Sequence, residues 1–313
     1  MDTLRYVLKR IFLTIPVLII VSILAFALVH LIPGDPVAVL LGEHATPEAT
    51  AALTEKYGLD KTLPEQYFMY LKNILHGDLG SSIRYNRPAL ELIGKRITVT
   101  LGLTGMALLF VIIISFPLGY LAGMKKDKLP DYLVKLFSLL GLSIPSFWVG
   151  LMLLLVFGVN LKCFPVSGWG NTIAEHIKSL FLPAMTQAFA TAALVVRNLR
   201  NNVIDVRNCD YVKFAKSKGL SEKDVSIYHI IRNALMPTVT LISMQCAMLV
   251  GGSVVIESIF TLPGMGALLV ESVYSRDYAV VQSLILVFAV EVMIINLITD
   301  ILYSLIDPRI KLS

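Results

Sequence analysis

The sequence predicts an all-α membrane protein that crosses the bilayer six times. Hydrophobic residues make up 56% of the 313 residues and charged residues only 16%, whereas ordinary soluble domains carry about 25% charged residues. Several uninterrupted apolar runs also reach the ~20 residues that a helix needs to cross the hydrocarbon core. The net charge of +5 is then typical of lysine and arginine in cytoplasmic loops rather than of a nucleic-acid site.

Six apolar segments have the length of a membrane span. The first is longer than the hydrophobic region of a signal peptide, and no small-x-small cleavage site follows it, so we expect a retained helix. The third contains Pro145 and the fourth Pro183, which membrane helices tolerate where neighbouring helices satisfy the freed backbone groups. The expected spans are residues 11–32, 97–124, 134–159, 180–199, 236–260 and 280–306.

Charge asymmetry predicts the orientation. Most of the 27 lysines and arginines fall on one side of the membrane if the N-terminus is cytoplasmic, so the positive-inside rule places both termini in the cytoplasm. The chain then divides into an N-terminal helix (1–32), an extracytoplasmic segment (33–96), a membrane domain (97–306) and a cytoplasmic tail (307–313). The polar stretch at about 200–235 becomes a cytoplasmic loop of the membrane domain.

The extracytoplasmic segment is predicted to be a small folded element. The stretch "TPEATAALTEKYGL" is typical of a helix with Thr46 as its N-cap and Pro47 as its first residue. A second helix is expected in "LPEQYFMYLKNILHG", whose apolar residues recur on one face at helical spacing. That face comprises Phe68, Leu71, Ile74 and Leu75.

The most polar stretch of the chain, "DYVKFAKSKGLSEKD" at residues 210–224, lies in the cytoplasmic loop. A helical pattern is interrupted at Gly219, and Ser221 is expected to cap a second short helix with Asp224 at its third position. The stretch has no recognisable nucleic-acid module, and its apolar side is small for a membrane-surface helix. We favour docking onto a cytoplasmic partner. The apolar side comprises Val212, Ala215, Leu220 and Val225.

Motifs of catalysis are missing from the sequence. There is no GxxxxGK[ST], HExxH or GxSxG, and the glycines of "LPGMGALL" are interpreted as a turn. Ser167 could be the nucleophile of an intramembrane protease, but it lies in an expected outside loop with no histidine placed to activate it, so a turn is the favoured interpretation. The three cysteines and five histidines show no metal-ligand spacing. We predict that the chain is not an enzyme and binds no metal or cofactor itself.

Carboxylates inside membrane spans are costly and are functional hypotheses by default. Glu257 lies near the outer end of the fifth expected span, Glu291 in the middle of the sixth, and Asp300 further along the sixth. Each could line a translocation path, act as a proton site or hydrogen-bond to a neighbouring helix. We favour the structural interpretation for Asp300 and leave both interpretations open for Glu257 and Glu291.

The stretch "SIPSFWVG" joins Pro145 to small residues and a tryptophan. A kinked helix that packs closely on its neighbours is the favoured interpretation, because small residues let helices approach one another. The alternative is a kink that lines the substrate path with Ser143, Ser146 and Phe147.

Motifs spread over almost the whole chain resemble those of one family. The chain looks like a permease subunit of a bacterial ABC importer of the dipeptide, oligopeptide or nickel type, namely the first of its two membrane subunits. The order and spacing of the motifs make the resemblance specific. They include "HLIPGDP", "YGLDKTLPEQY", "GDLGSSI", "SIPSFWVG", "FPVSGWG", "DYVKFAKSKGLSEKDV", "RNALMPTVT" and "GGSVVIESIFTLPGMG".

The resemblance implies a type I importer fold and identifies the polar loop with the EAA loop, a helix of which sits in a cleft on a separate ATPase subunit. Ala215 and Gly219 match the alanine and glycine of that loop, and Pro237 matches its closing proline. Lys213 departs from the acid that many members carry, although lysine is usual in the peptide branch. The residues expected to touch the ATPase are Tyr211, Phe214, Ala215 and Leu220.

The resemblance also implies an assembly in the bacterial plasma (inner) membrane. The expected partners are a homologous second permease, two cytoplasmic ABC ATPases that bind ATP and Mg, an extracytoplasmic substrate-binding protein and membrane lipid, with no nucleic acid. Di- and oligopeptides are the expected substrates, and nickel, a metal chelate or glutathione are alternatives. A more distant alternative is an ion-coupled carrier with Glu291 and Asp300 as proton sites. The lack of an inverted repeat counts against it.

Overall fold

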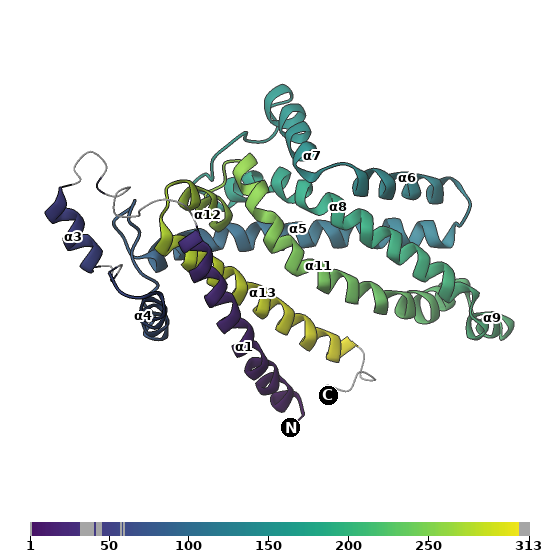
Figure 1. Cartoon of the computed structure of the whole chain (residues 1–313). Coiled ribbons are helices and arrows are strands. Elements are labelled where there is room, and N and C mark those ends of the chain that lie inside the picture. The colour runs from purple at the N-terminus through teal and green to yellow at the C-terminus, as the bar shows by residue number, and fades with distance from the viewer. Residues whose placement is uncertain (1, 32–40, 42–45, 57, 59, 307–313) are drawn as a thin grey trace. The chain divides into compact units, whose positions relative to one another are not determined.

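In the computed structural model (Figure 1) the regular elements of the described residues are all helices, and the β structure among them is one isolated bridge between Ser81 and Pro88. The expected all-α fold is therefore confirmed. The described residues are 2–31, 41, 46–56, 58 and 60–306.

Four continuous helical stretches are long and apolar enough to cross a membrane. The first expected span is also a single helix, α1 (Asp2–Leu31), although its apolar part with described side chains is the shorter stretch Phe12–Leu28. The four long stretches are α5 (Ala89–Met124), α8 (Ile173–Asn208), Glu222–Ile259, which ends in α11 (Arg232–Ile259), and α13 (Tyr278–Ile306).

The third expected span is broken rather than kinked. α6 (Leu129–Ser143) and α7 (Ser146–Leu153), which continues as the π-helix η2 (Leu154–Asn160), meet at an angle of 104°. Ile144 is extended, with φ −89° and ψ 127°, because the residue before a proline is pushed out of the helical region. The expected single helix over residues 134–159 is thus wrong, and Pro145 is the reason.

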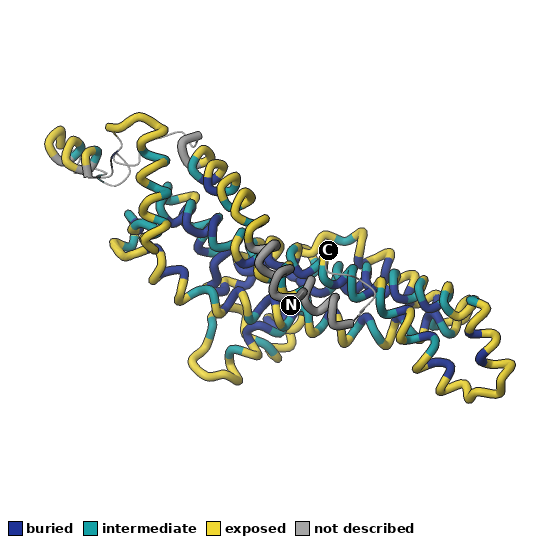
Figure 2. The backbone as a smooth tube through the Cα atoms, turned by 90° about the horizontal axis from the view of Figure 1, so that it is seen from below, coloured by how far each residue is buried: buried dark blue, intermediate teal, exposed yellow. Residues whose placement is uncertain are grey.

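The chain folds into two compact units, and each is described by itself. The first comprises the described parts of residues 1–100 and 263–294, and the second those of 101–262 and 295–313. Figure 2 shows buried and exposed residues next to each other along the long helices. Each span therefore keeps an uncovered side, which in a membrane faces lipid or another subunit.

α8 is the central helix of the second unit. In its most apolar window 67% of the residues are buried, against 28–33% in the other long stretches. Glycines on the neighbouring helices let them approach it closely. A Cβ added at Gly141 of α6 would lie 2.4 Å from the Ala193 Cβ, and one at Gly123 of α5 would lie 2.6 Å from the Val203 Cβ.

The first unit contains α1, the described parts of the segment expected to be extracytoplasmic (33–96), the start of α5, α12 (Met265–Tyr274) and most of α13. In the segment, α3 (Pro47–Lys56) begins at Pro47 as expected, and the Thr46 carbonyl accepts the hydrogen bond from the Thr50 N–H. The second expected helix is α4 (Leu63–Leu75), whose N-terminus is closed by Thr62 and Glu65. The core of the unit consists of Ala89, Leu92, Ile93, Met265, Leu268, Val280 and Leu284.

Candidate functional site

The polar loop forms a short helix and a turn at Gly219, as expected, but the expected second short helix is the beginning of one continuous helical stretch, Glu222–Ile259. α9 (Asp210–Ser217) is followed by a turn at Gly219, by α10 (Glu222–Asp224) and by the π-helix η3 (Val225–Ile231), which runs directly into α11. We call residues 210–231 the coupling element. Its continuity with α11 means that any displacement of the element reaches a membrane span without an intervening loop.

Gly219 ends α9 in a conformation that favours glycine. Its φ is +81°, its N–H donates to the Lys216 carbonyl (2.9 Å), and the next N–H, that of Leu220, donates to the Ala215 carbonyl (3.4 Å). These two bonds form a Schellman motif, the usual glycine-dependent helix end. An added Cβ would meet no atom within 4 Å, so backbone conformation rather than space selects glycine here.

Ser221 begins the second helix, as expected. Its hydroxyl accepts the hydrogen bond from the Asp224 N–H (3.1 Å) and donates to the Asp224 carboxylate (2.6 Å). The N-cap therefore satisfies one of the backbone donors left open at the start of a helix. Together with Gly219 it fixes the angle between α9 and the following helix.

The apolar side of the coupling element faces the protein's own membrane helices. Val212 and Val225 are fully buried and Ala215 is 5% exposed. They pack with Leu199, Val203, Ile230 and Ala234 in one core cluster. Ala215 was expected to touch the ATPase, but most of its side chain lies within this cluster, where α9 meets α8 and η3; its contact with the ATPase stays a prediction. An alanine at this position lets α9 lie close to the helices beneath it.

Other large apolar side chains of the coupling element are exposed. Tyr211 is 45% exposed, Phe214 61% and Leu220 44%, and further along Tyr228 is 64% exposed. Exposed side chains of this size, three of them aromatic, are typical of a protein-docking surface. We call these four residues the aromatic face. Three of them were expected to touch the ATPase from the sequence, and Tyr228 was not.

Charged side chains surround the aromatic face and are paired within the coupling element. The Lys213 ammonium lies 2.9 Å from the Asp210 carboxylate, and Lys216 lies 2.8 Å from Glu222. The hydrogen bond from Lys213 lowers the pKa of the Asp210 carboxyl group, whereas partial burial raises the pKa of the Tyr211 hydroxyl group. The Lys218 ammonium also lies over the Phe214 ring, 4.6 Å from its centroid.

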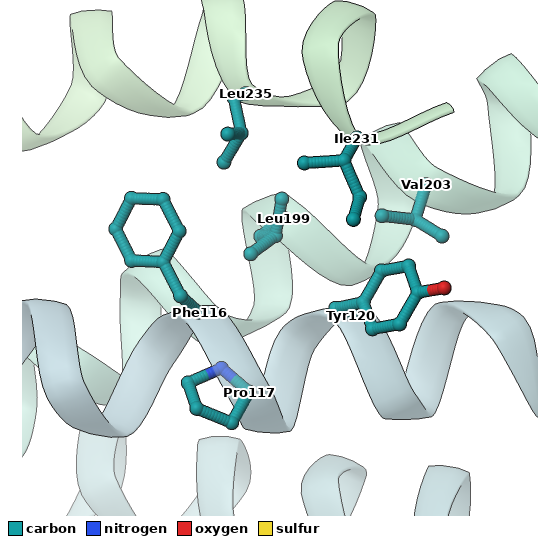
Figure 3. A pocket seen from close by; sticks show the side chains of 7 residues that line it. All are labelled: Phe116, Pro117, Tyr120, Leu199, Val203, Ile231 and Leu235. Carbon is teal, nitrogen blue, oxygen red and sulfur yellow. The ribbon is translucent and has the colours of Figure 1, made fainter. Parts of the chain in front are cut away.

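An apolar cavity of about 180 Å³ lies beside the coupling element, between α5, α8 and the junction of η3 with α11 (Figure 3). At this junction the Tyr120 hydroxyl of α5 is hydrogen-bonded to Ser226 of η3. Hydrophobic side chains dominate the lining, so no polar substrate is recognised here. The lining residues are Phe116, Pro117, Tyr120, Leu199, Val203, Ile231 and Leu235.

A polar cluster ties the start of α11 to α8. The Asn202 side-chain amide donates to the Asn198 side chain (2.9 Å) and to the Thr238 hydroxyl (3.1 Å). Thr238 follows Pro237, which lies inside α11 and cannot donate a backbone hydrogen bond. The sequence analysis assigned Pro237 to the coupling loop and missed the two asparagines, because nothing in their spacing reveals a partner on another helix.

A buried ion pair joins α6 to α8 in the same unit. Asp131 is fully buried and accepts hydrogen bonds from the guanidinium group of Arg200, one of them 2.9 Å long. Lys135 lies 3.0 Å from the same carboxylate, and the Asp127 N–H also donates to it (2.9 Å). The carboxylate therefore has several partners, which a buried charge requires. The sequence analysis did not identify this pair.

The expected translocation-path residues fall into two groups. Ser143, Ser146 and Phe147 lie at the break between α6 and α7, and all three are exposed. Glu257 on α11 is fully buried and Glu291 on α13 is 6% exposed. A role of any of these five residues in translocation remains a prediction. The side chain of Asp300 lies outside the part of the chain that the structure describes.

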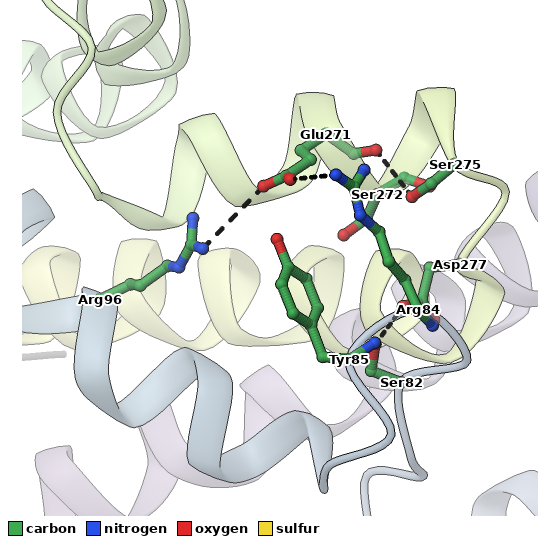
Figure 4. Close-up of polar contacts among 8 residues, drawn as sticks. All are labelled: Ser82, Arg84, Tyr85, Arg96, Glu271, Ser272, Ser275 and Asp277. Atoms are coloured by element: carbon green, nitrogen blue, oxygen red, sulfur yellow. Dashed lines mark hydrogen bonds and ion pairs between the residues drawn. The ribbon is translucent and has the colours of Figure 1, made fainter.

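In the first unit, an ionic cluster holds α12 against the loop that precedes α5 (Figure 4). The Arg84 guanidinium lies 2.9 Å and that of Arg96 3.9 Å from the Glu271 carboxylate. Tyr85 points into the same cluster, and burial together with the Glu271 carboxylate raises the pKa of its hydroxyl group. Both arginines and the tyrosine thus converge on one residue of α12.

Asp277, at the corner between α12 and α13, closes the same cluster. Its carboxylate accepts a hydrogen bond from the Ser82 hydroxyl and further bonds from the N–H groups of Ile83 (3.3 Å) and Arg84 (3.4 Å). We call the cluster of Ser82, Arg84, Tyr85, Arg96, Glu271 and Asp277 the α12 clamp.

Two family descriptions cover most of the chain. Residues 115–312 match the binding-protein-dependent transport system inner membrane component. Residues 3–104 match the N-terminal part described for the membrane components of the same transport systems. The first match includes the coupling element and the polar clusters that surround it, and the second includes α1 and α4.

Curated relatives match over nearly the whole chain. The glutathione transport system permease protein GsiC of Salmonella paratyphi A is 38% identical over 308 residues, which cover 98% of this chain and 99% of the relative. The protein of the same name from Escherichia coli O6:H1 is 39% identical over the same shares. The alignments therefore span nearly the full length of both proteins.

A solved structure shows the same fold. A crystal structure of an amino acid ABC transporter with histidines aligns with a TM-score of 0.50 at 16% identity, and covers 70% of this chain and 94% of that one. The fold, the family matches and the relatives agree. The chain therefore belongs to the binding-protein-dependent transport system inner membrane components, and it is a multi-pass permease subunit of an ABC importer.

Proposed function

We propose that the aromatic face of the coupling element docks onto an ATPase subunit and transmits the movement of that subunit to the membrane spans. The permease uses this movement to transport short peptides. The observation that carries the proposal is that the apolar side chains of the element fall into two sets. One set is buried in the protein's own core, and the other, Tyr211, Phe214 and Leu220, is exposed. An element built in this way is fixed to the spans and still offers a surface to a partner.

The physical basis of coupling is stiffness. Val212 and Val225 are buried against α8 and α11, and a close-packed interior transmits displacement instead of absorbing it. The aromatic face supplies contact area with few rotatable bonds, which lowers the entropy lost on docking. A cleft on the ATPase that closes around Phe214 would therefore displace η3 and α11 as one body.

The proposed assembly contains two permeases, two ATPases and a substrate-binding protein. ATP and Mg bind to the ATPases, and this chain catalyses no reaction. Both termini and the coupling element lie in the cytoplasm, and the segment at residues 33–96 lies outside. Support comes from the lysine and arginine distribution and from the family, which is named for its dependence on a binding protein.

The substrate class is argued from the relatives. Permeases named for glutathione transport are 38–39% identical over nearly full length, and glutathione is a tripeptide. We propose short peptides, glutathione included, as the transported class. Binding of glutathione and of di- to pentapeptides to the partner substrate-binding protein tests this part. A binding protein that takes only a nickel ion or a metal chelate would overturn the peptide assignment and leave the coupling proposal intact.

Phe214→Ala tests the docking surface. The ring is 61% exposed, so its loss removes little packing within this chain. We expect fewer ATPase subunits to copurify with the solubilised complex and uptake to fall several-fold. Tyr274→Ala is the matched control, because Tyr274 is 86% exposed on α12, far from the coupling element in sequence. Equal ATPase retention in Phe214→Ala and wild type would contradict the assignment of the aromatic face.

The topology is tested by a cysteine at Ser221 in a background where Cys163, Cys209 and Cys246 are serine. We expect a membrane-permeant maleimide to label it in intact cells and an impermeant one to fail. Labelling by the impermeant reagent would place the coupling element outside and exclude ATPase docking there.

The energy source is tested by uptake into vesicles that are supplied with ATP after the proton gradient has been collapsed. An ATP-driven importer continues to take up substrate under these conditions, whereas an ion-coupled carrier does not.

A further inference from the structure

Helix α4 carries two adjacent apolar stripes, each at the helical spacing i, i+3, i+7. The first consists of Tyr67, Tyr70 and Ile74, and the second of Phe68, Leu71 and Leu75. The remaining positions carry mostly polar residues, among them Glu65, Lys72 and Asn73. A helix that rests on a single neighbour needs only one such stripe, so the second stripe requires a separate explanation.

The first stripe packs against the membrane helix α1. The Tyr67 hydroxyl and the Ser22 hydroxyl are 2.9 Å apart and hydrogen-bonded. The Phe26 ring lies edge-on to Tyr67, with 5.4 Å between the centroids, and 6.0 Å from Tyr70. Tyr67 and Tyr70 are half-buried as a result. Two aromatic contacts and one hydrogen bond therefore fix α4 to the C-terminal third of α1.

The second stripe is uncovered within the part of the chain that the structure describes. Phe68 is 71% exposed and Leu75 is 85% exposed, and Leu71 between them is half-buried. Exposed aromatic and aliphatic side chains one and two turns apart on the same helix form a contiguous apolar surface. Water is an unfavourable neighbour for such a surface, at a cost of about 25 cal/mol per Å² of apolar area.

The contacts on α1 give the depth of α4 in the membrane. Arg10 is the last basic residue before the apolar run of α1, and a hydrocarbon core about 30 Å thick needs ~20 residues, so the far boundary lies near His30. Ser22 and Phe26 are eight and four residues before His30. At 1.5 Å per residue α4 therefore lies roughly 6–12 Å inside that boundary, which is the depth of the upper acyl chains.

We propose that α4 is an interfacial membrane helix whose second stripe is inserted among lipid acyl chains. The occupant is lipid because the stripe lies at acyl-chain depth beside α1. The neighbouring surface of α1 is itself apolar and exposed along that depth, at Ile19, Ile20, Ile23, Leu24 and Leu28. Lys72, next to the stripe on the polar side, can extend its ammonium to the headgroups. Contact with lipid does not depend on the orientation of the chain. The proposed topology adds only that the lipid belongs to the outer leaflet.

The interfacial position gives the extracytoplasmic segment a fixed height above the membrane. Burial of Phe68 and Leu75 in lipid removes apolar surface from water and adds to the contacts with Ser22 and Phe26. α4 is thus held on two sides, by α1 and by lipid. Glu65, whose side chain accepts a hydrogen bond from the Thr62 N–H (3.0 Å), stabilises the polar start of the helix.

Lipid contact is tested with an environment-sensitive fluorophore on the assembled transporter in nanodiscs. Single cysteines replace Phe68, Leu75 or Asn73 in the background without Cys163, Cys209 and Cys246, and each carries a bimane label. We expect lipids brominated high on the acyl chain to quench the labels at Phe68 and Leu75 several-fold more than the label at Asn73, an exposed position on the opposite face of α4.

Equal quenching at the three positions, or quenching at Asn73 alone, would overturn the proposal. A photo-cross-link from position 75 to another transporter subunit would also overturn it, because the occupant would then be protein. The measurement needs neither ATP nor substrate, so its failure is distinguishable from failure of ATPase docking. Uptake by the labelled variants shows that the proteins are folded, which keeps a negative quenching result decisive.

Discussion

Two arginine–carboxylate pairs join distant parts of the chain, and they differ in burial. In the pair of Arg200 with Asp131 the carboxylate is fully buried and the arginine side chain is 14% exposed. In the pair of Arg84 with Glu271 the side chains are 49% and 33% exposed. The chemistry is the same, but water and salt reach only the second pair. The helices next to the coupling element are thus joined by groups withdrawn from water, whereas the α12 clamp uses contacts that water can replace.

The difference matches what each region has to do. In the proposed function the coupling element moves the spans, so α5, α6 and α8 would have to move together when it is displaced. Close glycine contacts and a buried ion pair provide that stiffness. The α12 clamp holds a loop on a short helix, for which half-exposed contacts suffice. The same residue types therefore give a stiff joint or a weaker one according to burial.

The largest difference is expected when the carboxylate of each pair is removed. Asp131→Ala leaves the Arg200 charge largely buried without its partner, which costs ~3–5 kcal/mol. Glu271→Ala leaves Arg84 in contact with water and costs ~0–1 kcal/mol. Melting temperatures of the solubilised transporter, followed by intrinsic fluorescence, compare the two. Equal destabilisation by both substitutions would contradict the claim that burial makes the pair of Arg200 with Asp131 the stronger of the two.

A paired apolar replacement is the control for Asp131. Asp131→Leu combined with Arg200→Met removes both charges together, and such replacements of buried pairs are often neutral or stabilising. We expect the double variant to melt closer to the wild type than Asp131→Ala does. A double variant that is less stable than Asp131→Ala would show that the site needs the carboxylate for another reason.

A glycine pair on α5 isolates the contribution of close packing. A Cβ at Gly123 would lie 2.6 Å from Val203, whereas one at Gly105 would meet nothing within 4 Å. Overpacking should make Gly123→Ala less stable by ~1–3 kcal/mol. Gly105→Ala should gain up to ~1 kcal/mol, because alanine is the better helix former. Thermal unfolding of both variants measures the difference, and equal shifts would exclude close packing as the cause.

The smallest effect concerns salt. Added sodium chloride screens exposed charges more than buried ones, so it should weaken the pair of Arg84 with Glu271 and spare the pair of Arg200 with Asp131. We expect the small difference in melting temperature between wild type and Glu271→Ala to shrink as salt rises. The larger difference for Asp131→Ala should persist. A salt-sensitive Asp131→Ala difference would mean that water reaches the buried pair.

Local features of the coupling element could be predicted from the sequence, because they depend on neighbouring residues. Gly219 indicates a helix end because glycine readily adopts the positive φ that such an end requires, and the structure has that φ. Ser221 indicates the cap by its spacing from Asp224. The side that Val212 and Ala215 would face could not be predicted. An apolar stripe shows that a helix has a partner, and the sequence pattern is the same whether that partner belongs to the same chain or to another.

Longer-range features were missed for the same reason. Asp131 and Arg200 are 69 residues apart, and nothing in either local sequence indicates the other. The break at Pro145 was expected as a kink, because proline inside a membrane helix can be tolerated or can end the helix. The extended conformation of Ile144 depends on where α6 and α7 pack, which a single sequence does not reveal.

The most direct test of the coupling role compares Gly219→Val with Gly77→Val in the reconstituted transporter. Both glycines have positive φ, +81° and +79°, and neither has an atom within 4 Å of an added Cβ. Each substitution should therefore add a similar backbone strain of ~1–3 kcal/mol, but only Gly219 lies in the coupling element. The measurement is the ATP hydrolysed per substrate molecule imported into proteoliposomes. The coupling role predicts that this ratio rises several-fold in Gly219→Val and stays at the wild-type value in Gly77→Val. A wild-type ratio in Gly219→Val would contradict it.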